Sequence, residues 1–435
     1  MNNTTQESTF YDFILKPGEM LLKSKSVRRK FYYRLINNIW DALRSSGCDT
    51  TGTHIKREQG IVAVRTRDRS AGDVLRRVFG VTSLVLVQRV DTTDLNEIVR
   101  LGTDHFKDVV AGKRFAVRCK RSGDTAFSSQ DVGRALGAAL HPFSNGVDLT
   151  NPEAVCRLDV HGDSVKFYTE ETPAFGGLPI GTQGKAICLI SGGIDSPVAA
   201  WYGLKRGLEV HYLFCCLGGP MQHWGPSASS WLLAQRWSYG YEPRFYIADF
   251  NELLHAFRNL DSRFRNILLK RYLYRAADRL ADKLKADAII TGEALGQVSS
   301  QTLSNLRTIT GVTDRLIMRP LIGFDKREII ERARDIGSLE ISEKVPEFCN
   351  VAVSRPRTTS EAWELDDLEK DIDHDIAEQA ITNWETQYLR RMQQPAQPDD
   401  PVMTEPPPGT WHVWIENPEI PGEPPDNFPV DETID

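Results

Sequence analysis

The chain has 435 residues, of which 26% are charged and 40% hydrophobic, and a formal net charge of −6. This length predicts two or three domains. No apolar run reaches the roughly 18 residues of a membrane-spanning helix, and residues 1–9 lack the apolar core of a signal peptide, so we expect a cytoplasmic protein with no membrane partner. The seven cysteines form no CxxC pair and no Cys/His cluster of zinc spacing, so neither a disulfide scaffold nor a structural metal site is indicated.

Charge is distributed unevenly along the chain. Residues 361–435 contain twenty Asp or Glu against three Lys or Arg, which leaves residues 1–360 with a net charge of +11. A basic body predicts a polyanionic partner, of which nucleic acid is the commonest. A solvated surface of mixed charge is the alternative.

The N-terminal segment predicts a small α+β unit. Apolar positions recur at helical spacing from Val27, and strands are expected at 61–64 and 84–87 around a helix near 71–79. Five cations crowd the start of the first helix, where the helix dipole disfavours them. They are Lys23, Lys25, Arg28, Arg29 and Lys30. This crowding predicts a phosphate-binding surface, with a solvated helix face as the alternative.

A second small unit follows. Residues 115–121 alternate apolar and basic side chains as a half-buried strand does, and Ser128 and Asp131 cap a helix that runs to about Leu140. A hairpin is expected over 155–168. The exposed face of the first strand presents three cations, Arg118, Lys120 and Arg121.

Residues 184–333 alternate strands and helices, including a long helix expected over 251–284, and predict a doubly wound α/β domain. Ligands of such sheets lie beyond the carboxyl ends of the strands. The strand at 186–190 ends in Ser-Gly-Gly-Ile-Asp-Ser, and Pro197 follows at a helix start. Backbone N–H groups at such a glycine turn and helix N-terminus bind phosphate. The predicted phosphate-binding residues are Ser191, Gly192, Gly193, Asp195 and Ser196.

The turn differs from the GxxxxGK[ST] nucleotide loop, because it has no lysine at its end and contains Asp195 instead. A carboxylate beside bound phosphates predicts a ligand for Mg²⁺ that bridges them. The turn resembles the pyrophosphatase loop (PP loop) of N-type ATP pyrophosphatases, which split ATP between the α and β phosphates. A plain strand-to-helix turn capped by serine is the alternative.

Four stretches together resemble the ThiI family, the tRNA 4-thiouridine synthases, and they occur in the family's order. They are GEMLLKSKSVRRKFYYRLINNI (18–39), FAVRCKRSGDTAFSSQDVGRALGAAL (115–140), FGGLPIGTQGKAICLISGGIDSPVAAW (175–201) and TGEALGQVSSQTLSNL (291–306). The resemblance implies a ferredoxin-like unit (1–80), a THUMP RNA-binding domain (81–173) and a PP-loop ATP pyrophosphatase domain (174–360). Composition then predicts an acidic helical extension (361–394) and a mostly disordered tail (395–435) with eleven prolines and no Lys or Arg.

The resemblance also implies an activity. ATP adenylates O4 of a uridine, at tRNA position 8 in the family, and a sulfur nucleophile displaces AMP to give 4-thiouridine. Asp195 and Cys349, the latter in a Pro-Glu-Phe-Cys segment, match the catalytic positions, and members commonly act as homodimers. Further ATP contacts are implied at Cys188, Leu189, Leu213, Phe214, Lys270, Gly292 and Gln301.

Many bacterial members carry a C-terminal rhodanese domain whose cysteine bears the persulfide sulfur. Here no cysteine follows Cys349, so we expect this domain to be absent. The sulfur then comes from another protein, such as a cysteine desulfurase or a separate rhodanese, from sulfide, or from another cysteine of the chain, for which Cys215 and Cys216 are candidates. The family's second role, sulfur supply to the thiazole of thiamine, is tied to the rhodanese domain in the bacteria that have one, and it stays open for this chain.

Two other functions remain open from the sequence. The chain is a PP-loop thiolase that acts at a different tRNA position, or a tRNA-binding THUMP protein whose α/β domain binds ATP without sulfur chemistry.

Overall fold

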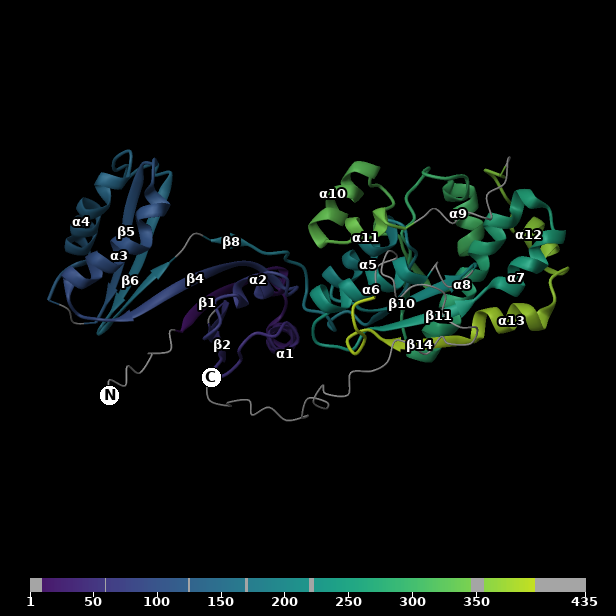
Figure 1. Ribbon diagram of the computed structural model, residues 1–435, viewed down its shortest axis with the longest axis horizontal. Coiled ribbons are helices and arrows are strands. Elements are labelled where there is room, and N and C mark those ends of the chain that lie inside the picture. Colours follow the sequence, from purple (N-terminus) through teal and green to yellow (C-terminus); the bar gives the residue numbers. More distant parts are fainter. Residues whose placement is uncertain are drawn as a thin grey trace, which may run out of the picture. The chain divides into compact units, whose positions relative to one another are not determined.

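Two sheets organise the chain in the computed structural model, which describes residues 10–58, 60–123, 126–168, 171–218, 223–345 and 356–395 (Figure 1). The contacts divide the chain into two units. Unit 1 comprises residues 1–184, 202–209 and 236–241, and unit 2 comprises residues 185–201, 210–235 and 242–435. None of the described helices is both long and apolar enough to cross a bilayer. Cys349 and residues 396–435 of the expected tail lie outside the described residues.

The sheet of unit 1 has the strand order β2-β3-β1-β4-β7-β6-β5, with β8 paired to β4. Its elements are β1 (Tyr11–Pro17), α1 (Lys25–Ser45), β2 (His54–Glu58), β3 (Ile61–Thr66), α2 (Ala71–Leu75), β4 (Val81–Asp91), α3 (Leu95–Val110), β5 (Phe115–Ser122), α4 (Ser129–Leu140), β6 (Ala154–His161), β7 (Ser164–Tyr168) and β8 (Thr172–Pro173). The long strand β4 joins two α+β halves, because it pairs with β1 over its first part and with β7 over its second.

Each half of unit 1 has its own core. In the first half, Leu35 and Ile39 of α1 pack with Phe13 and Leu15 of β1. In the second, Phe106, Leu136, Leu158 and Phe167 bring α3 and α4 onto the sheet. The expected cap of α4 is confirmed, since Ser128 and Asp131 form a reciprocal capping box. The helix expected over 71–79 is shorter in the structure, where α2 ends at Leu75.

The sheet of unit 2 has the order β13-β12-β9-β10-β11-β14. Its elements are β9 (Lys185–Leu189), α5 (Asp195–Lys205), β10 (Glu209–Cys216), α6 (Trp224–Trp237), β11 (Arg244–Asp249), α7 (Asn251–Ala256), α8 (Arg265–Leu284), β12 (Ala288–Ile290), α9 (Leu303–Thr310), β13 (Leu316–Met318), α10 (Lys326–Ile336), α11 (Leu339–Glu343), α12 (Ala362–Glu369), α13 (His374–Thr382) and β14 (Trp384–Tyr388). The pairs β13–β12, β12–β9 and β10–β11 are parallel. The chain order reverses beside β9, which is the switch point where such sheets bind ligands.

The single long helix expected over 251–284 is wrong. The chain forms α7, then leaves helical geometry at Leu260 (φ −91°, ψ 161°), and Asp261 caps a short 3₁₀ turn before α8 begins. The local cap at Asp261 outweighs the apolar periodicity that continues across it.

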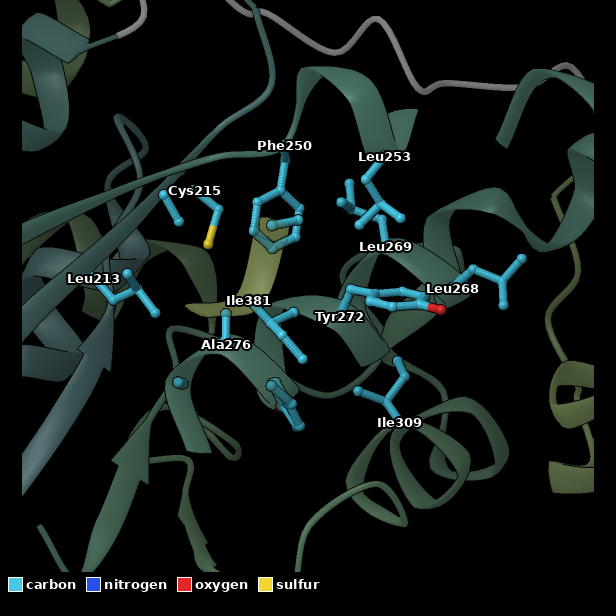
Figure 2. Close-up of a cluster of buried hydrophobic side chains, with 14 of the residues drawn as sticks. Leu213, Cys215, Phe250, Leu253, Leu268, Leu269, Tyr272, Ala276, Ile309 and Ile381 are labelled. Carbon is cyan, nitrogen blue, oxygen red and sulfur yellow. The ribbon is translucent and has the colours of Figure 1, made fainter. Parts of the chain in front are cut away.

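The C-terminal extension contains a strand as well as the two helices α12 and α13, so the expectation of a wholly helical segment is also wrong. β14 pairs antiparallel with β11 at the sheet edge (Figure 1), because the stretch 384–388 alternates β-forming side chains with polar ones. Ile381 of α13 belongs to the main hydrophobic cluster of unit 2, together with Phe250, Leu269 and Tyr272 (Figure 2). The extension is therefore part of the core of this unit.

Glu369 at the end of α12 ties the extension to α8. Its carboxylate accepts from Arg271 Nε (2.8 Å) and Arg275 Nη2 (2.6 Å), and the Arg271 side chain is only 4% exposed. We expect Glu369→Ala to lower the free energy of unfolding by roughly 3 kcal/mol, because it removes a largely buried partner of two arginines. The matched control is Asp367→Ala, whose exposed pair with Lys370 predicts a change within about 0.5 kcal/mol. Denaturant unfolding measures both, and equal effects of the two variants contradict the prediction.

Candidate functional site

The predicted phosphate turn closes on itself at the carboxyl end of β9. Ser191 N–H donates to Ser196 Oγ (2.9 Å), the two serine hydroxyls lie 3.1 Å apart, and Gly193 N–H approaches Ser191 Oγ at 3.4 Å. α5 begins at Asp195, so Pro197 falls in its first turn, where a proline nitrogen needs no hydrogen. These bonds give the turn a fixed shape at the N-terminus of a helix, which is the geometry of an anion site.

Lys326 supplies the cation that this turn lacks. Its Nζ donates to Asp195 Oδ1 (2.8 Å) from the first residue of α10, and both side chains are partly exposed. α10 is fixed at this end by a capping box between Asp325 and Glu328. Lys326 is not among the residues that the sequence indicated. The capping pattern Asp-Lys-Arg-Glu was the available signal, but it marks a helix start and gives no indication of what the helix faces.

Gly292 packs directly on the start of α5. A Cβ at this position would lie 2.7 Å from Ser196 N and 2.9 Å from the carbonyl carbon of Asp195. The segment after β12 therefore contacts the backbone at the start of α5, and glycine is the residue that permits this close approach.

Glu293 follows Gly292 and is the centre of a buried polar cluster. Its carboxylate accepts from Lys270 Nζ (2.7 Å), Arg319 Nε (2.9 Å), Thr291 Oγ1 (3.1 Å) and the Tyr274 hydroxyl. Lys270 is therefore held beside the segment that contacts the phosphate turn, and one carboxylate is shared by two cations. Neither Glu293 nor Arg319 was found from the sequence, because an acid after a strand and an arginine before a proline have no periodicity of their own.

The charge of Glu293 makes stability depend on pH. Burial by itself raises its pKa, but the charge and hydrogen bond of Lys270, with Tyr274 and Arg319, outweigh burial and lower the pKa to about 2. A carboxyl group with a lowered folded pKa stabilises the fold above its unfolded value near 4.5, and this stabilisation is lost as pH falls from that value toward 2. The shift corresponds to roughly 3 kcal/mol.

We therefore expect Glu293→Gln to lower the free energy of unfolding near pH 7, and the difference from the unmodified protein to shrink as the pH falls through about 4. Urea unfolding at a series of pH values measures this difference. Glu331→Gln is the control, because its partner Arg327 is 86% exposed and such surface pairs contribute little. If the loss of unfolding free energy in Glu293→Gln is the same at every pH, the lowered pKa of Glu293 is contradicted.

Three of the other predicted nucleotide contacts, Cys188, Leu213 and Phe214, have buried side chains. The side chains of Cys188 and Leu213 are fully buried, so only their backbone atoms are available to a ligand. Burial raises the pKa of Cys188, which keeps it a neutral thiol. Phe214 is also buried, and its ring meets the His223 ring edge-on at 5.3 Å. Leu189 ends β9 next to the turn.

Gln301 has a buried side-chain acceptor that a ligand donor would satisfy. It lies at the end of a short 3₁₀ turn (Ser299–Gln301), and its Oε1 is buried without a hydrogen-bond partner within the described part of the chain. A buried acceptor without a donor is costly unless something else supplies one. The exocyclic amino group of adenine is a donor of that kind, so Gln301 fits a nucleotide.

The predicted tRNA-binding cations lie on unit 1. Lys23, Lys25, Arg29 and Lys30 are exposed before and along the first turns of α1, and Arg28 is half-buried and points Nη1 at Leu21 O. On β5, Arg118, Lys120 and Arg121 are exposed, and Arg118 Nη2 donates to Leu149 O (2.6 Å). Both sets have the exposure that contact with a polyanion requires.

These features define a class: an α/β protein with a PP loop at the switch point of its sheet, preceded by a basic α+β unit. Three family models match the chain, namely the ThiI ferredoxin-like domain over residues 12–85, the THUMP domain over 92–170 and the thiamine biosynthesis protein (ThiI) over 181–374. The fold class expected from the sequence, with ferredoxin-like and THUMP units before a doubly wound PP-loop domain, is confirmed.

Curated relatives extend the match over most of the chain. A probable tRNA sulfurtransferase of Saccharolobus solfataricus is 40% identical over 350 residues, which are 80% of this chain and 92% of that protein. A tRNA sulfurtransferase of Desulfurococcus amylolyticus is 39% identical, over 83% of this chain and 75% of that protein. A solved 4-thiouridine synthetase in complex with RNA and ATP is 30% identical with a TM-score of 0.75, and the match covers 87% of this chain and 99% of that one. The chain belongs to the ThiI family of tRNA sulfurtransferases.

Proposed function

We propose that this protein uses ATP to adenylate O4 of a uridine in tRNA, at position 8, and then replaces that oxygen with sulfur to give 4-thiouridine. The observation that carries the proposal is the closed turn Ser191–Ser196 at the switch point, with Lys326 on Asp195 and Gly292 on the first turn of α5. ATP and RNA are the ligands bound to the related 4-thiouridine synthetase.

The residues divide the first step between them. The turn amides and the Lys326 ammonium hold the departing pyrophosphate, while O4 of the uridine attacks the α-phosphorus. The O4–P bond forms, the bond from the α-phosphorus to the bridging oxygen breaks, and pyrophosphate leaves. Cys188, Leu189, Leu213, Phe214, Lys270, Gly292 and Gln301 bind the rest of the nucleotide.

Asp195 suits a metal ion that is held mainly by phosphate. Within the described ranges, no three His, Cys, Asp or Glu side chains are grouped as metal ligands. Asp195 therefore fits a metal ion that has few protein ligands. Mg²⁺ is commonly bound by one or two carboxylates together with substrate phosphates. When bound, Mg²⁺ neutralises charge on the pyrophosphate that leaves.

Sulfur enters in the second step. A sulfur nucleophile attacks C4 of the adenylated uridine, and the C4–O bond to AMP breaks. With sulfide, this step gives 4-thiouridine directly. With a persulfide on a separate protein, the outer sulfur forms the C4–S bond, and we assign to Cys349 the thiol that then attacks the inner sulfur, so that the S–S bond breaks and 4-thiouridine is released. The disulfide left on Cys349 is reduced by an external thiol before the next turnover. The cations of unit 1 hold the tRNA. The ferredoxin-like, THUMP and PP-loop domains have the boundaries expected from the sequence. The enzyme acts as a homodimer in the cytoplasm.

The test uses unmodified tRNA, Mg-ATP and either sulfide or a protein persulfide, with mass spectrometry of the nucleosides and an assay of pyrophosphate. We expect 4-thiouridine at position 8 and pyrophosphate release that requires tRNA. Thiolation at another position favours a different PP-loop thiolase. Bound tRNA with no thiolated base from either donor overturns the proposal in favour of a tRNA-binding protein without sulfur chemistry.

A further inference from the structure

The adjacent cysteines Cys215 and Cys216 have different environments. Successive side chains of a strand point to opposite faces of the sheet. Cys215 lies in the hydrophobic cluster with Leu213 and Phe250 (Figure 2), where burial raises the pKa of its thiol. Cys216 is the last residue of β10 and lies at the carboxyl edge of the sheet. The two thiols therefore lie on opposite faces of the sheet. Both are buried, and Cys216, which is 4% exposed, is the one that lies outside the hydrophobic cluster of Cys215.

Cys216 has a histidine and a carboxylate beside it. Its Sγ lies 3.1 Å from His223 Nε2 and 2.8 Å from Gly218 O. His223 immediately precedes α6 and is half-buried. Asp249, which ends β11, pairs with Cys216 in the parallel register and is held by Asn251 through its backbone N–H (2.9 Å) and its Nδ2 (2.7 Å). A nucleophile, a base and a nearby fixed carboxylate are thus brought to one edge of the sheet by three separate segments.

The charges favour a neutral pair. Burial raises the pKa of the Cys216 thiol, the Gly218 backbone opposes this shift, and Asp249 adds to it. Burial lowers the pKa of His223, and Asp249 opposes this shift. Near neutral pH the pair is a thiol and an uncharged imidazole, and the imidazole nitrogen is able to accept the thiol proton as the sulfur attacks.

The pair lies beside the phosphate turn. Gly225, two residues after His223, packs closely against Gly192 of the turn. A Cβ added at position 225 would lie 3.2 Å from Gly192 Cα. The ring of Phe214, a predicted nucleotide contact, meets His223 edge-on. The Cys216–His223 pair and the phosphate turn are therefore linked through the first residues of α6.

We propose that Cys216 is a sulfur-accepting thiol that takes the sulfane sulfur of a persulfide, with His223 as its general base. In this step, which rests on the proposed function, His223 removes the Cys216 proton and Sγ attacks the outer sulfur of R–S–SH. The new bond is Cys216 Sγ–S, the S–S bond of the donor breaks, and the proton passes to the leaving thiolate to give R–SH. One persulfide is consumed and one is formed, so no oxidant or reductant is needed.

The test loads the full chain with glutathione persulfide, without tRNA or ATP, in a Cys349→Ser background. Peptide mass spectrometry then follows the gain of one sulfur atom at each cysteine. Cys216 is more buried than the half-buried Cys48 and Cys119, but we expect it to load faster because His223 lies 3.1 Å from its Sγ. We expect His223→Gln to slow loading of Cys216 about 100-fold, in the range of general-base effects. The exposed His255→Gln is the matched control and leaves the rate unchanged.

A second readout separates this proposal from the overall function. We expect Cys216→Ser to keep tRNA-dependent pyrophosphate release and sulfide-driven thiolation, and to lose thiolation from limiting glutathione persulfide. Cys216→Ala serves in its place if thermal unfolding shows that serine disturbs the fold. Equal loading of Cys48, Cys119 and Cys216, no effect of His223→Gln, or full persulfide-driven thiolation by the folded variant overturns the proposal. Each of these outcomes leaves the pyrophosphate readout of the proposed function intact.

Discussion

Replacing Asp195 with asparagine is expected to lower the rate of 4-thiouridine formation by at least about 100-fold, with tRNA binding unchanged. Asparagine keeps the shape of the side chain but removes the negative charge that pairs with Lys326 across 2.8 Å. The turn then has neither its carboxylate for a metal ion nor a charged anchor for the lysine. Losing a preorganised charged group at a reacting phosphate typically costs two or three orders of magnitude in rate.

The measurement is single-turnover formation of 4-thiouridine, with tRNA affinity determined in parallel by filter binding. The exposed Asp335→Asn is the control, since Asp335 pairs with Arg332 across one turn of α10 and lies at the other end of that helix. Normal turnover by Asp195→Asn contradicts the assigned role of the turn. Loss of tRNA binding together with activity indicates a folding defect and is detected by the same experiment.

The second large effect is expected from Gly292→Ala. The added Cβ overlaps Ser196 N and the Asp195 carbonyl carbon, which are backbone atoms of the first turn of α5 and have no side-chain freedom to yield. Relieving the overlap displaces either the phosphate turn or the segment that contains Glu293. Overpacking of this kind costs about 1–3 kcal/mol, so we expect the dissociation constant for ATP to rise roughly 10- to 100-fold.

Titration calorimetry with ATP measures this change. Gly323→Ala is the matched control in the same unit, because a Cβ there has no neighbour within 4 Å in the described structure. We expect unit 1, and with it tRNA affinity, to be unaffected by either change. Unaltered ATP affinity in Gly292→Ala contradicts the contact between this segment and the nucleotide site.

The features that the sequence predicted well are local ones. The turn Ser191–Ser196 and the cap of α4 depend on residues a few positions apart, and their geometry follows from glycine freedom and short side-chain bonds. Predictions that extended a helical pattern over a longer stretch of the chain were wrong. The helix expected over 251–284 is divided before α8, and the acidic extension ends in β14 because pairing with β11 satisfies an edge of the sheet.

The sequence by itself determined the order of the domains, the alternation of strands and helices in unit 2, the phosphate turn and the basic character of unit 1. Those properties depend on composition, periodicity and neighbours along the chain. Only the tertiary structure decided which side chains meet across long distances in the sequence. Lys326 reaches Asp195 from 131 residues away, Glu293 collects Lys270 and Arg319, and the strand separates Cys215 from Cys216. The physical reason is that a charge or a thiol has no sequence period that indicates its partner, so the pairing is fixed by how the helices pack on the sheet.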